Sequence, residues 1–191
     1  MQPRSEAAGM EPLAGVQGEV MWRSRRKELE RQYEDLLREF GPGLSRLVAS
    51  YESRMHDRED LLQDIRLSLW TALPGFRGEC SLRTFVYRIA HNRSLSHAYH
   101  RRRQLPESEE PVEIVDPKSN PESTAIENAM QARLAQAIRT LPVPYRQVIT
   151  MALENLPHSE IAQVLGISET NVAVRLNRAR LLLREKVGHL R

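Results

Sequence analysis

The chain has 191 residues, 40% of them hydrophobic and 28% charged, which is enough for one or two small domains with modest cores. Its 28 basic and 25 acidic residues leave a formal net charge of only +3, so the total charge alone identifies no partner. The single cysteine, Cys80, excludes an internal disulfide. The first 20 residues lack a signal-peptide core, and no run reaches the ~18 apolar residues of a membrane span, so we expect a cytoplasmic protein.

The N-terminal part of the chain predicts a tail followed by two short helices. Residues 1–23 show no periodicity, which predicts a disordered tail. Apolar residues then recur at helical spacing as far as Phe40. The sequence GPG at 41–43 predicts that this helix stops or bends, and a second helix is expected over 44–51.

Two further helices complete a predicted first domain over 24–103. A stripe of leucines and isoleucines after Asp57 predicts one helix, which the pair Pro74-Gly75 ends. The segment 82–103 predicts the other. Its expected inward face comprises Leu82, Phe85, Val86, Ile89, Ala90 and Leu95.

Charge is sorted into blocks along the chain. The segment 81–103 contains six arginines, three histidines and no carboxylate, whereas 104–128 contains seven carboxylates and one lysine. A basic block binds a polyanion by releasing its counterions, and an acidic block is repelled from the same surface. We therefore expect a nucleic acid as the partner.

A second small helical domain is predicted over 124–191. The segment 104–123 is acidic and contains four prolines, which predicts a flexible linker. Helical periodicity returns at Thr124 and is interrupted by PVP at 142–144. Since no segment alternates convincingly as a strand does, the chain is predicted to be all-α with two domains.

The stretch HSEIAQVLGISETNVAVRLNRAR, residues 158–180, has the pattern of a helix-turn-helix. Gly166 stands at the turn, Ser168 can cap the second helix, and Val172 and Leu176 face inward. The alternative is a packed helical hairpin with arginines on its solvated face. The candidate DNA-binding residues are Ser168, Asn171, Ala173, Val174, Arg175, Asn177, Arg178 and Arg180.

Three motifs in this order resemble a known family. They are DREDLLQDIRLSLW, GFRGECSLRTFVYRIAHNRSLSHAYHRRR and LPVPYRQVITMALENLPHSEIAQVLGISETNVAVRLNRAR, and the similarity spans about residues 30–187. They are similar to regions two and four of the extracytoplasmic-function sigma factors, compact members of the bacterial sigma-70 family. The resemblance implies a non-catalytic protein that binds core RNA polymerase, brings it to promoter DNA and helps to open the duplex.

The resemblance also implies roles for particular residues. The residues implied to dock on the clamp helices of the largest polymerase subunit are Asp57, Asp60, Gln63 and Asp64, while the second domain would meet the flap region. Those implied in promoter melting are Phe76, Arg77, Ser81, Arg83, Tyr87, Arg88, His91, Asn92, Arg93, Arg101, Arg102 and Arg103. Asn92 matches the family position that hydrogen-bonds a flipped base.

The chain departs from the family at the recognition helix. Members often carry GTVKSRL, whereas this chain has TNVAVRL, with Ala173 in place of a lysine and Val174 in place of a serine. Apolar contacts with thymine methyl groups become possible at these two positions. The acidic linker resembles the family's connector, which threads through the polymerase cleft, but it could equally be a solubilising tether.

Three other functions fit the sequence less well. A dimeric helix-turn-helix regulator would need a self-complementary interface, which is not evident. An enzyme would need convergent catalytic groups; His56, Asp60 and Asp64 have helical spacing for a metal, but such combinations are common by chance, so neither a metal nor a cofactor is expected. A sigma-like inhibitor conflicts with the intact basic segment. An anti-sigma factor is a possible partner.

Overall fold

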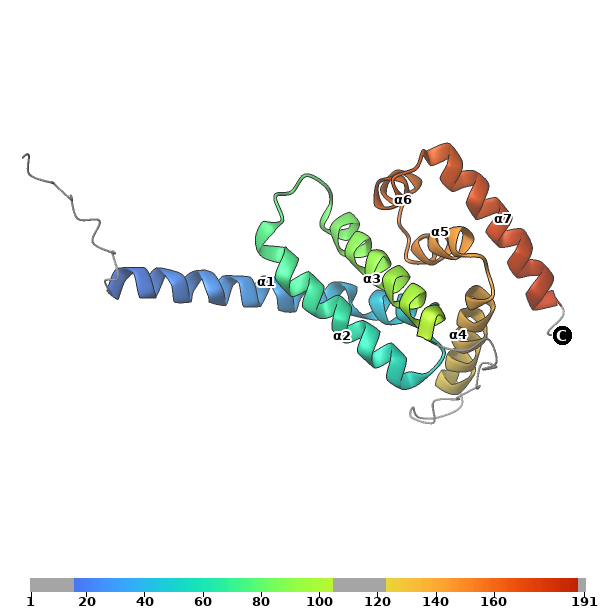
Figure 1. The fold of residues 1–191 in the computed structure, drawn as a ribbon, viewed down its shortest axis with the longest axis horizontal. Coiled ribbons are helices and arrows are strands. Elements are labelled where there is room, and N and C mark those ends of the chain that lie inside the picture. The colour runs from blue at the N-terminus through green and yellow to red at the C-terminus, as the bar shows by residue number, and fades with distance from the viewer. Residues whose placement is uncertain (1–15, 105–122, 189–191) are drawn as a thin grey trace, which may run out of the picture.

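The computed structural model describes residues 16–104 and 123–188, and within this part of the chain every regular element is a helix (Figure 1). The elements are α1 (Val16–Ala49), α2 (Met55–Ala72), the short 3-10 helix η1 (Leu73–Gly75), α3 (Leu82–Gln104), α4 (Ser123–Arg139), α5 (Val143–Leu153), α6 (His158–Leu165) and α7 (Glu169–Gly188). The predicted all-α class is confirmed. Among the described helices, none is both long and apolar enough to cross a membrane.

The first three helices pack around a leucine-rich core. α1 contacts both α2 and α3, and α2 contacts α3 along much of its length. The most buried apolar side chains of this core are Leu36, Leu44, Leu47, Val48, Leu61, Ile65, Leu69, Val86 and Ala90. Burial of these side chains supplies the main driving force for this domain.

The helix does not stop at residues 41–43. α1 continues through Pro42 to Ala49, so the prediction of a separate helix over 44–51 is wrong. Pro42 removes one backbone hydrogen bond, but Gly41 before it has no Cβ to clash with the proline ring. The apolar stripe continues across the GPG sequence, and Phe40 and Leu44 are both buried in the core. Tertiary packing therefore overrides the local signal.

The N-terminal boundary also differs from the prediction. α1 begins at Val16, so residues 16–23, which were assigned to a disordered tail, are helical. The rest of the predicted tail, residues 1–15, lies outside the described residues. The side chains of Met21 and Trp22 are exposed on this end of α1, which extends away from the body of the molecule (Figure 1).

The buried face of α3 is more polar than predicted. Leu95, expected to point inward, is 38% exposed. The buried positions instead include Thr84, Tyr87, His91 and Ser94, which recur at spacings of three and four. A search for apolar periodicity misses such a face, because the residues that line it are polar or amphipathic.

Helices α4 to α7 form the second domain and pack directly on the first. α7 contacts α4, α5 and α6, and its buried side chains are Val172, Leu176 and Ala179. Between the domains, α6 contacts α3 and α4 contacts α1 (Figure 1). The buried residues of both domains belong to one continuous hydrophobic cluster. Most of the predicted linker, residues 105–122, lies outside the described residues.

Candidate nucleic-acid interface

The helix-turn-helix of α6 and α7 has the local geometry that its sequence predicts. Gly166 ends α6 in the left-handed region with φ 65°, where a side chain would be strained. The Ser168 hydroxyl accepts the backbone N–H of Asn171 at 3.2 Å, so the predicted cap of α7 is confirmed. Buried Val172 and Leu176 then fix how α7 rotates about its axis.

That rotation decides which side chains of α7 can meet a duplex. Among the predicted DNA-binding residues, Ser168, Asn171, Val174, Asn177, Arg178 and Arg180 are exposed, while Ala173 and Arg175 are half-buried. Val174 is 63% exposed, so its apolar side chain is available to a partner. An exposed helix with this mixture of arginine, asparagine and valine can contact phosphates, base edges and thymine methyl groups.

In the first domain, several of the predicted melting residues are accessible to solvent. Arg77, Ser81, Arg88, Asn92 and Arg93 are exposed. Phe76 is half-buried because its ring packs on Phe85, with 4.8 Å between the ring centroids. The loop before α3 is thus anchored by an aromatic contact, while its polar side chains stay accessible.

Two residues predicted for the DNA-binding face are buried instead. Tyr87 is 3% exposed and packs edge-on against Phe40, and His91 is 1% exposed beside Tyr51. Burial lowers the pKa of His91 to about 3, so its imidazole is a neutral core group. Both placements were wrong, because the face that packs on α1 includes these positions.

A second correction concerns Arg101 and Asp57, which were predicted to contact a phosphate and the polymerase, respectively. The two side chains pair with each other at 2.5 Å, and Arg101 also pairs with the buried carboxylate of Glu52. The ring of His97 lies 3.1 Å from the same carboxylate. These contacts tie the C-terminal part of α3 to the start of α2. The side chains of Arg102 and Arg103 lie outside the described residues.

The other residues predicted to bind the polymerase lie together on the outer face of α2. Asp60, Gln63 and Asp64 are exposed. Leu67, one turn beyond Asp64, is 63% exposed. It was not among the residues predicted to bind the polymerase, although its position outside the apolar stripe indicates an exposed side chain. A groove of about 630 Å³ between α2 and α3 is lined by Asp64 and Leu67 on one side and by Asn92 and Arg93 on the other.

Three of the predicted melting residues also contact the second domain. Ser81 Oγ donates to Glu160 at 2.8 Å, and Arg83 Nη1 donates to the backbone carbonyl of Asn155 at 3.4 Å. Arg88 Nη2 donates to the carbonyl of Gln163 at 3.3 Å. In this arrangement the N-terminal half of α3 packs against α6, although the side chains of Ser81 and Arg88 remain exposed.

A three-helix domain with a basic helix, joined to a helix-turn-helix domain, defines a class of two-domain DNA-binding proteins. Residues 36–104 match the family described as "Sigma-70 region 2", and residues 131–183 match "Sigma-70, region 4". The chain belongs to the sigma-70 family and, within it, to the extracytoplasmic-function (ECF) sigma factors. Sigma factors are non-catalytic transcription initiation factors that bind core RNA polymerase and promoter DNA.

Curated relatives and solved structures agree with this assignment. The RNA polymerase sigma-H factor of Pseudomonas aeruginosa is 27% identical over 144 residues, which cover 70% of this chain and 75% of that protein. The ECF RNA polymerase sigma-E factor of Escherichia coli is 29% identical over 158 residues, covering 75% of this chain and 82% of that protein.

Two solved structures share the fold. CnrH in complex with the cytosolic domain of CnrY has a TM-score of 0.62 at 24% identity, covering 84% of this chain and 90% of that one. The sigma factor RpoE in complex with the anti-sigma factor NepR from Bartonella quintana has a TM-score of 0.65 at 20% identity, covering 83% and 98%.

Proposed function

We propose that this sigma factor divides its work among three surfaces. The outer face of α2 docks on the clamp helices of core RNA polymerase, the exposed residues of α3 and its preceding loop hold the melted promoter strand, and α7 reads the upstream promoter element. The observation that carries this proposal is the groove between α2 and α3, which sets Asp64 and Leu67 beside Asn92 and Arg93. A polymerase docked on α2 would thereby lie next to the strand being opened.

The face of α2 has the chemistry of a protein-docking surface. Asp60 and Asp64 are one helical turn apart and both exposed, so they can pair with a basic partner without disturbing the core. Leu67 adds an exposed apolar side chain that association would bury. Asp57 is assigned to the ion pair with Arg101 rather than to this surface.

The exposed groups of α3 suit a single strand. The side-chain amide of Asn92 offers a donor and an acceptor to the edge of an unstacked base. Arg93 and Arg77 supply cations for the phosphates on either side. The bases themselves are exposed only when the duplex is open, so these contacts favour melting.

The α7 surface suits a duplex. Asn171 and Arg175 can form paired hydrogen bonds with base edges in the major groove, while Arg178 and Arg180 contact phosphates. The second domain would also meet the flap region of the polymerase. The acidic linker is assigned to the polymerase cleft, where its charge would mimic nucleic acid.

An anti-sigma factor is included among the proposed partners. The support comes from the two related structures, which are complexes with CnrY and with the anti-sigma factor NepR. We also place the protein in the cytoplasm, where core RNA polymerase and the chromosome are found.

The test is transcription reconstituted from purified protein, core RNA polymerase and a fragmented genomic library, with start sites mapped. Asp60→Arg plus Asp64→Arg is expected to abolish specific initiation, because it reverses the charge of the docking face. The control Asp35→Arg plus Glu39→Arg makes the same charge change at the same spacing on exposed positions of α1 and should initiate normally.

Asn92→Ala is expected to lower the yield of open complex roughly tenfold while leaving binding to core unchanged, because it removes hydrogen bonds made only to the unstacked base. If the protein never binds core but protects duplex DNA from cleavage by itself, the sigma assignment of these surfaces is wrong and a dimeric regulator replaces it.

A further inference from the structure

The N-terminal part of α1 projects beyond the body of the first domain (Figure 1). Leu29 and Tyr33 still pack on the core, whereas every side chain from residue 21 to residue 28 is exposed. At 1.5 Å per residue, positions 16–28 form a helical segment about 20 Å long, which we call the α1 arm. The match to sigma-70 region 2 begins at residue 36, so membership of the family assigns the α1 arm no role.

The α1 arm carries a dense positive charge. Between residues 20 and 27 it has Arg23, Arg25, Arg26 and Lys27 and no carboxylate. Consecutive residues of an α-helix are about 100° apart around its axis, so these cations point to different sides of the arm. A partner therefore meets positive charge from whichever side it approaches. Clustered cations of this kind attract a polyanion and bind it by releasing its counterions.

An exposed tryptophan lies among these cations. Trp22 is 60% exposed, and the guanidinium of Arg26, one helical turn away, lies 5.5 Å from the centroid of its ring. Arg26 Nε also donates to Glu30 at 2.9 Å, which holds the guanidinium beside the ring. The two side chains together offer hydrogen-bond donors for a phosphate next to a flat apolar surface for a sugar.

The α1 arm leaves the body at the end of the first domain that carries the loop before α3. Tyr33 packs edge-on against Trp70 of α2, with 5.1 Å between the ring centroids, and its hydroxyl donates to the carbonyl of Arg66 at 2.9 Å. α1 also contacts η1, which leads into the loop. That loop carries Arg77, which is proposed to hold a phosphate of the melted strand. DNA bound at the loop would therefore continue past the arm.

Two other occupants fit the α1 arm less well. A helix that lies on an anionic membrane needs a continuous apolar face opposite its cations. In the arm the cations surround the helix, and among residues 21–28 only Met21 and Trp22 are apolar. A second copy of the chain would bring two sets of cations together, and juxtaposed like charges cost free energy. The charge and its distribution favour DNA.

We propose that the α1 arm is a further DNA-binding element, which holds the backbone of the promoter duplex next to the melted region. Arg25, Arg26 and Lys27 contact phosphates, and Trp22 packs against a deoxyribose. The contact is made to the backbone, so it adds affinity without sequence preference. The proposal rests on the function proposed above for the position of the melted strand, and it adds a surface that lies outside the sigma-70 match.

The first test measures how the affinity of the polymerase holoenzyme for promoter DNA depends on salt. Each lost phosphate contact lowers the slope of log K against log salt by about 0.9, so Arg25→Gln plus Lys27→Gln should lower it by roughly 2. The control Arg38→Gln plus Arg133→Gln makes the same change of net charge at exposed positions of α1 and α4 and should leave the slope unchanged. Equal slopes for the arm variant and the wild type overturn the proposal.

Binding to core polymerase is measured on the same preparations by fluorescence anisotropy. Both double variants should bind core as the wild type does. Loss of core binding in the arm variant alone would assign the α1 arm to the polymerase and overturn the proposal. Thermal unfolding followed by circular dichroism shows that each variant is folded before it is compared.

The second test identifies what the α1 arm touches. Trp22 is replaced by the photoreactive residue p-benzoylphenylalanine, which keeps an aromatic side chain, and the same replacement of Glu34 is the control at an exposed position on the body. In the complex of holoenzyme with promoter DNA, residue 22 should crosslink to DNA and residue 34 should not. Crosslinks from residue 22 to polymerase subunits only, or to neither partner, count against the proposal.

Sedimentation with phosphatidylglycerol vesicles tests the membrane alternative. The wild type and Arg25→Gln plus Lys27→Gln should sediment equally. Vesicle binding that this variant loses, with no change in its salt slope on DNA, would assign the α1 arm to a lipid surface instead. If Asn92→Ala leaves open-complex formation unchanged, the proposed function alone is wrong, because the crosslink from residue 22 reports on the arm separately.

Discussion

His91 shows how a titratable residue can become part of a core. It lies on α3 with 1% of its side chain exposed, and its Nδ1 atom is 3.3 Å from the Tyr51 hydroxyl. Burial disfavours the imidazolium and lowers the pKa of His91 from its ordinary value of 6.5 to about 3. His91 therefore stays neutral in the folded protein between about pH 3 and pH 6.5, the range in which it is protonated in the unfolded chain.

This difference predicts that stability falls in mild acid. Between the unfolded pKa of 6.5 and the folded pKa of about 3, the unfolded state binds one more proton than the folded state, so stability decreases as pH falls. The expected loss is at most about 1.4 kcal/mol per pH unit below 6.5, or roughly 2 kcal/mol at pH 5. Urea unfolding between pH 7.5 and 5 measures it.

The matched variant is His91→Gln, which keeps a polar side chain but has no proton to gain in this range. Its unfolding free energy should be lower than that of the wild type at pH 7.5 and should change less between pH 6.5 and 5. Equal pH dependence in the two proteins would show that groups other than His91 account for the acid sensitivity.

At the scale of the element, prediction succeeded where the deciding signals are local. The helix-turn-helix could be predicted because Gly166, the Ser168 cap and the inward Val172 are close in sequence and sufficient to set the turn. The unbroken α1 could not, because its continuation past Pro42 depends on a core that residues far along the chain complete.

The candidate nucleic-acid interface likewise has a part that the sequence predicts and a part that it does not. The exposed residues of α7 follow from the register of one helix, and the register was predicted correctly. The roles of Arg101 and Asp57 depend on Glu52, a buried carboxylate whose position relative to α3 the sequence does not indicate. Matching residues to a family identified the segment that carries the basic face, but not which of its side chains the fold buries.

A prediction for α7 concerns Val174. Its side chain is 63% exposed on the surface proposed to enter the major groove. An apolar side chain there can pack on a thymine methyl group. Replacing thymine by uracil in the mapped upstream element should weaken binding of the polymerase holoenzyme about fourfold at the contacted position, which is the approximate cost of losing one buried methyl.

The control is Val174→Ser, which restores the residue common in the family and removes the apolar surface. This variant should bind the thymine and uracil versions of the promoter equally well, as measured by filter binding or by electrophoretic mobility. An undiminished preference for thymine in Val174→Ser would assign the methyl contact to another side chain, of which Ala173 is the nearest.

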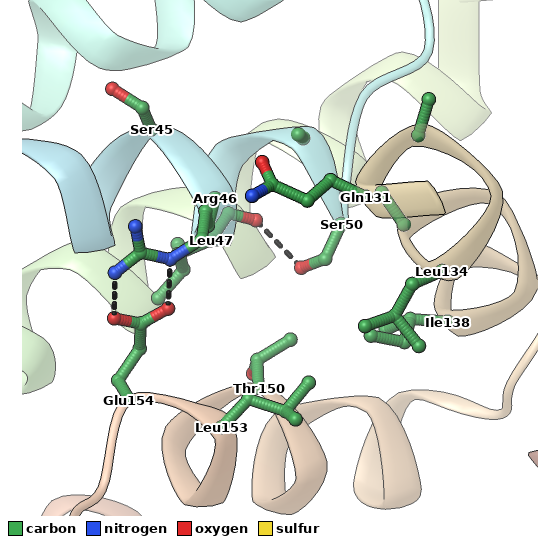
Figure 2. A pocket seen from close by; sticks show the side chains of 13 residues that line it. Ser45, Arg46, Leu47, Ser50, Gln131, Leu134, Ile138, Thr150, Leu153 and Glu154 are labelled. Carbon is green, nitrogen blue, oxygen red and sulfur yellow. Dashed lines mark hydrogen bonds and ion pairs between the residues drawn. The ribbon is translucent and has the colours of Figure 1, made fainter. Parts of the chain in front are cut away.

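At the scale of the whole molecule, several contacts form the seam between the two domains. One is the ion pair between Arg46 of α1 and Glu154 at the end of α5, with 2.6 Å between Nη2 and Oε2 (Figure 2). Arg139 Nη1 donates to the carbonyl of Ala49 at 2.6 Å, and the Arg146 guanidinium lies 5.4 Å from the centroid of the Tyr51 ring. Burial lowers the pKa of both arginines, because it disfavours the charged guanidinium. The continuous hydrophobic cluster also spans both domains. These contacts couple two domains that are individually small.

Coupling of this kind predicts that the wild type unfolds as one unit. Small domains have little core of their own, so the shared seam contributes a large fraction of each domain's stability. At about 0.7 kcal/mol per residue, one transition of the described helices has a van't Hoff enthalpy near 110 kcal/mol, whereas separate domains give values near 60 and 45 kcal/mol. Differential scanning calorimetry distinguishes these cases, because the calorimetric and van't Hoff enthalpies agree only for a single cooperative unit.

Gly43→Ala tests whether the seam is the source of that cooperativity. The added methyl group must displace Tyr87 or Glu154, whereas the methyl group of the control Gly75→Ala meets nothing within 4 Å. Gly43→Ala should therefore split the transition in two, and Gly75→Ala should keep it single. Two transitions in the wild type would mean that the domains fold independently and that the seam contributes little. The split in Gly43→Ala alone would show that one glycine in α1 joins the stability of the first domain to that of the second, since Tyr87 and Glu154 can meet only in the space it leaves.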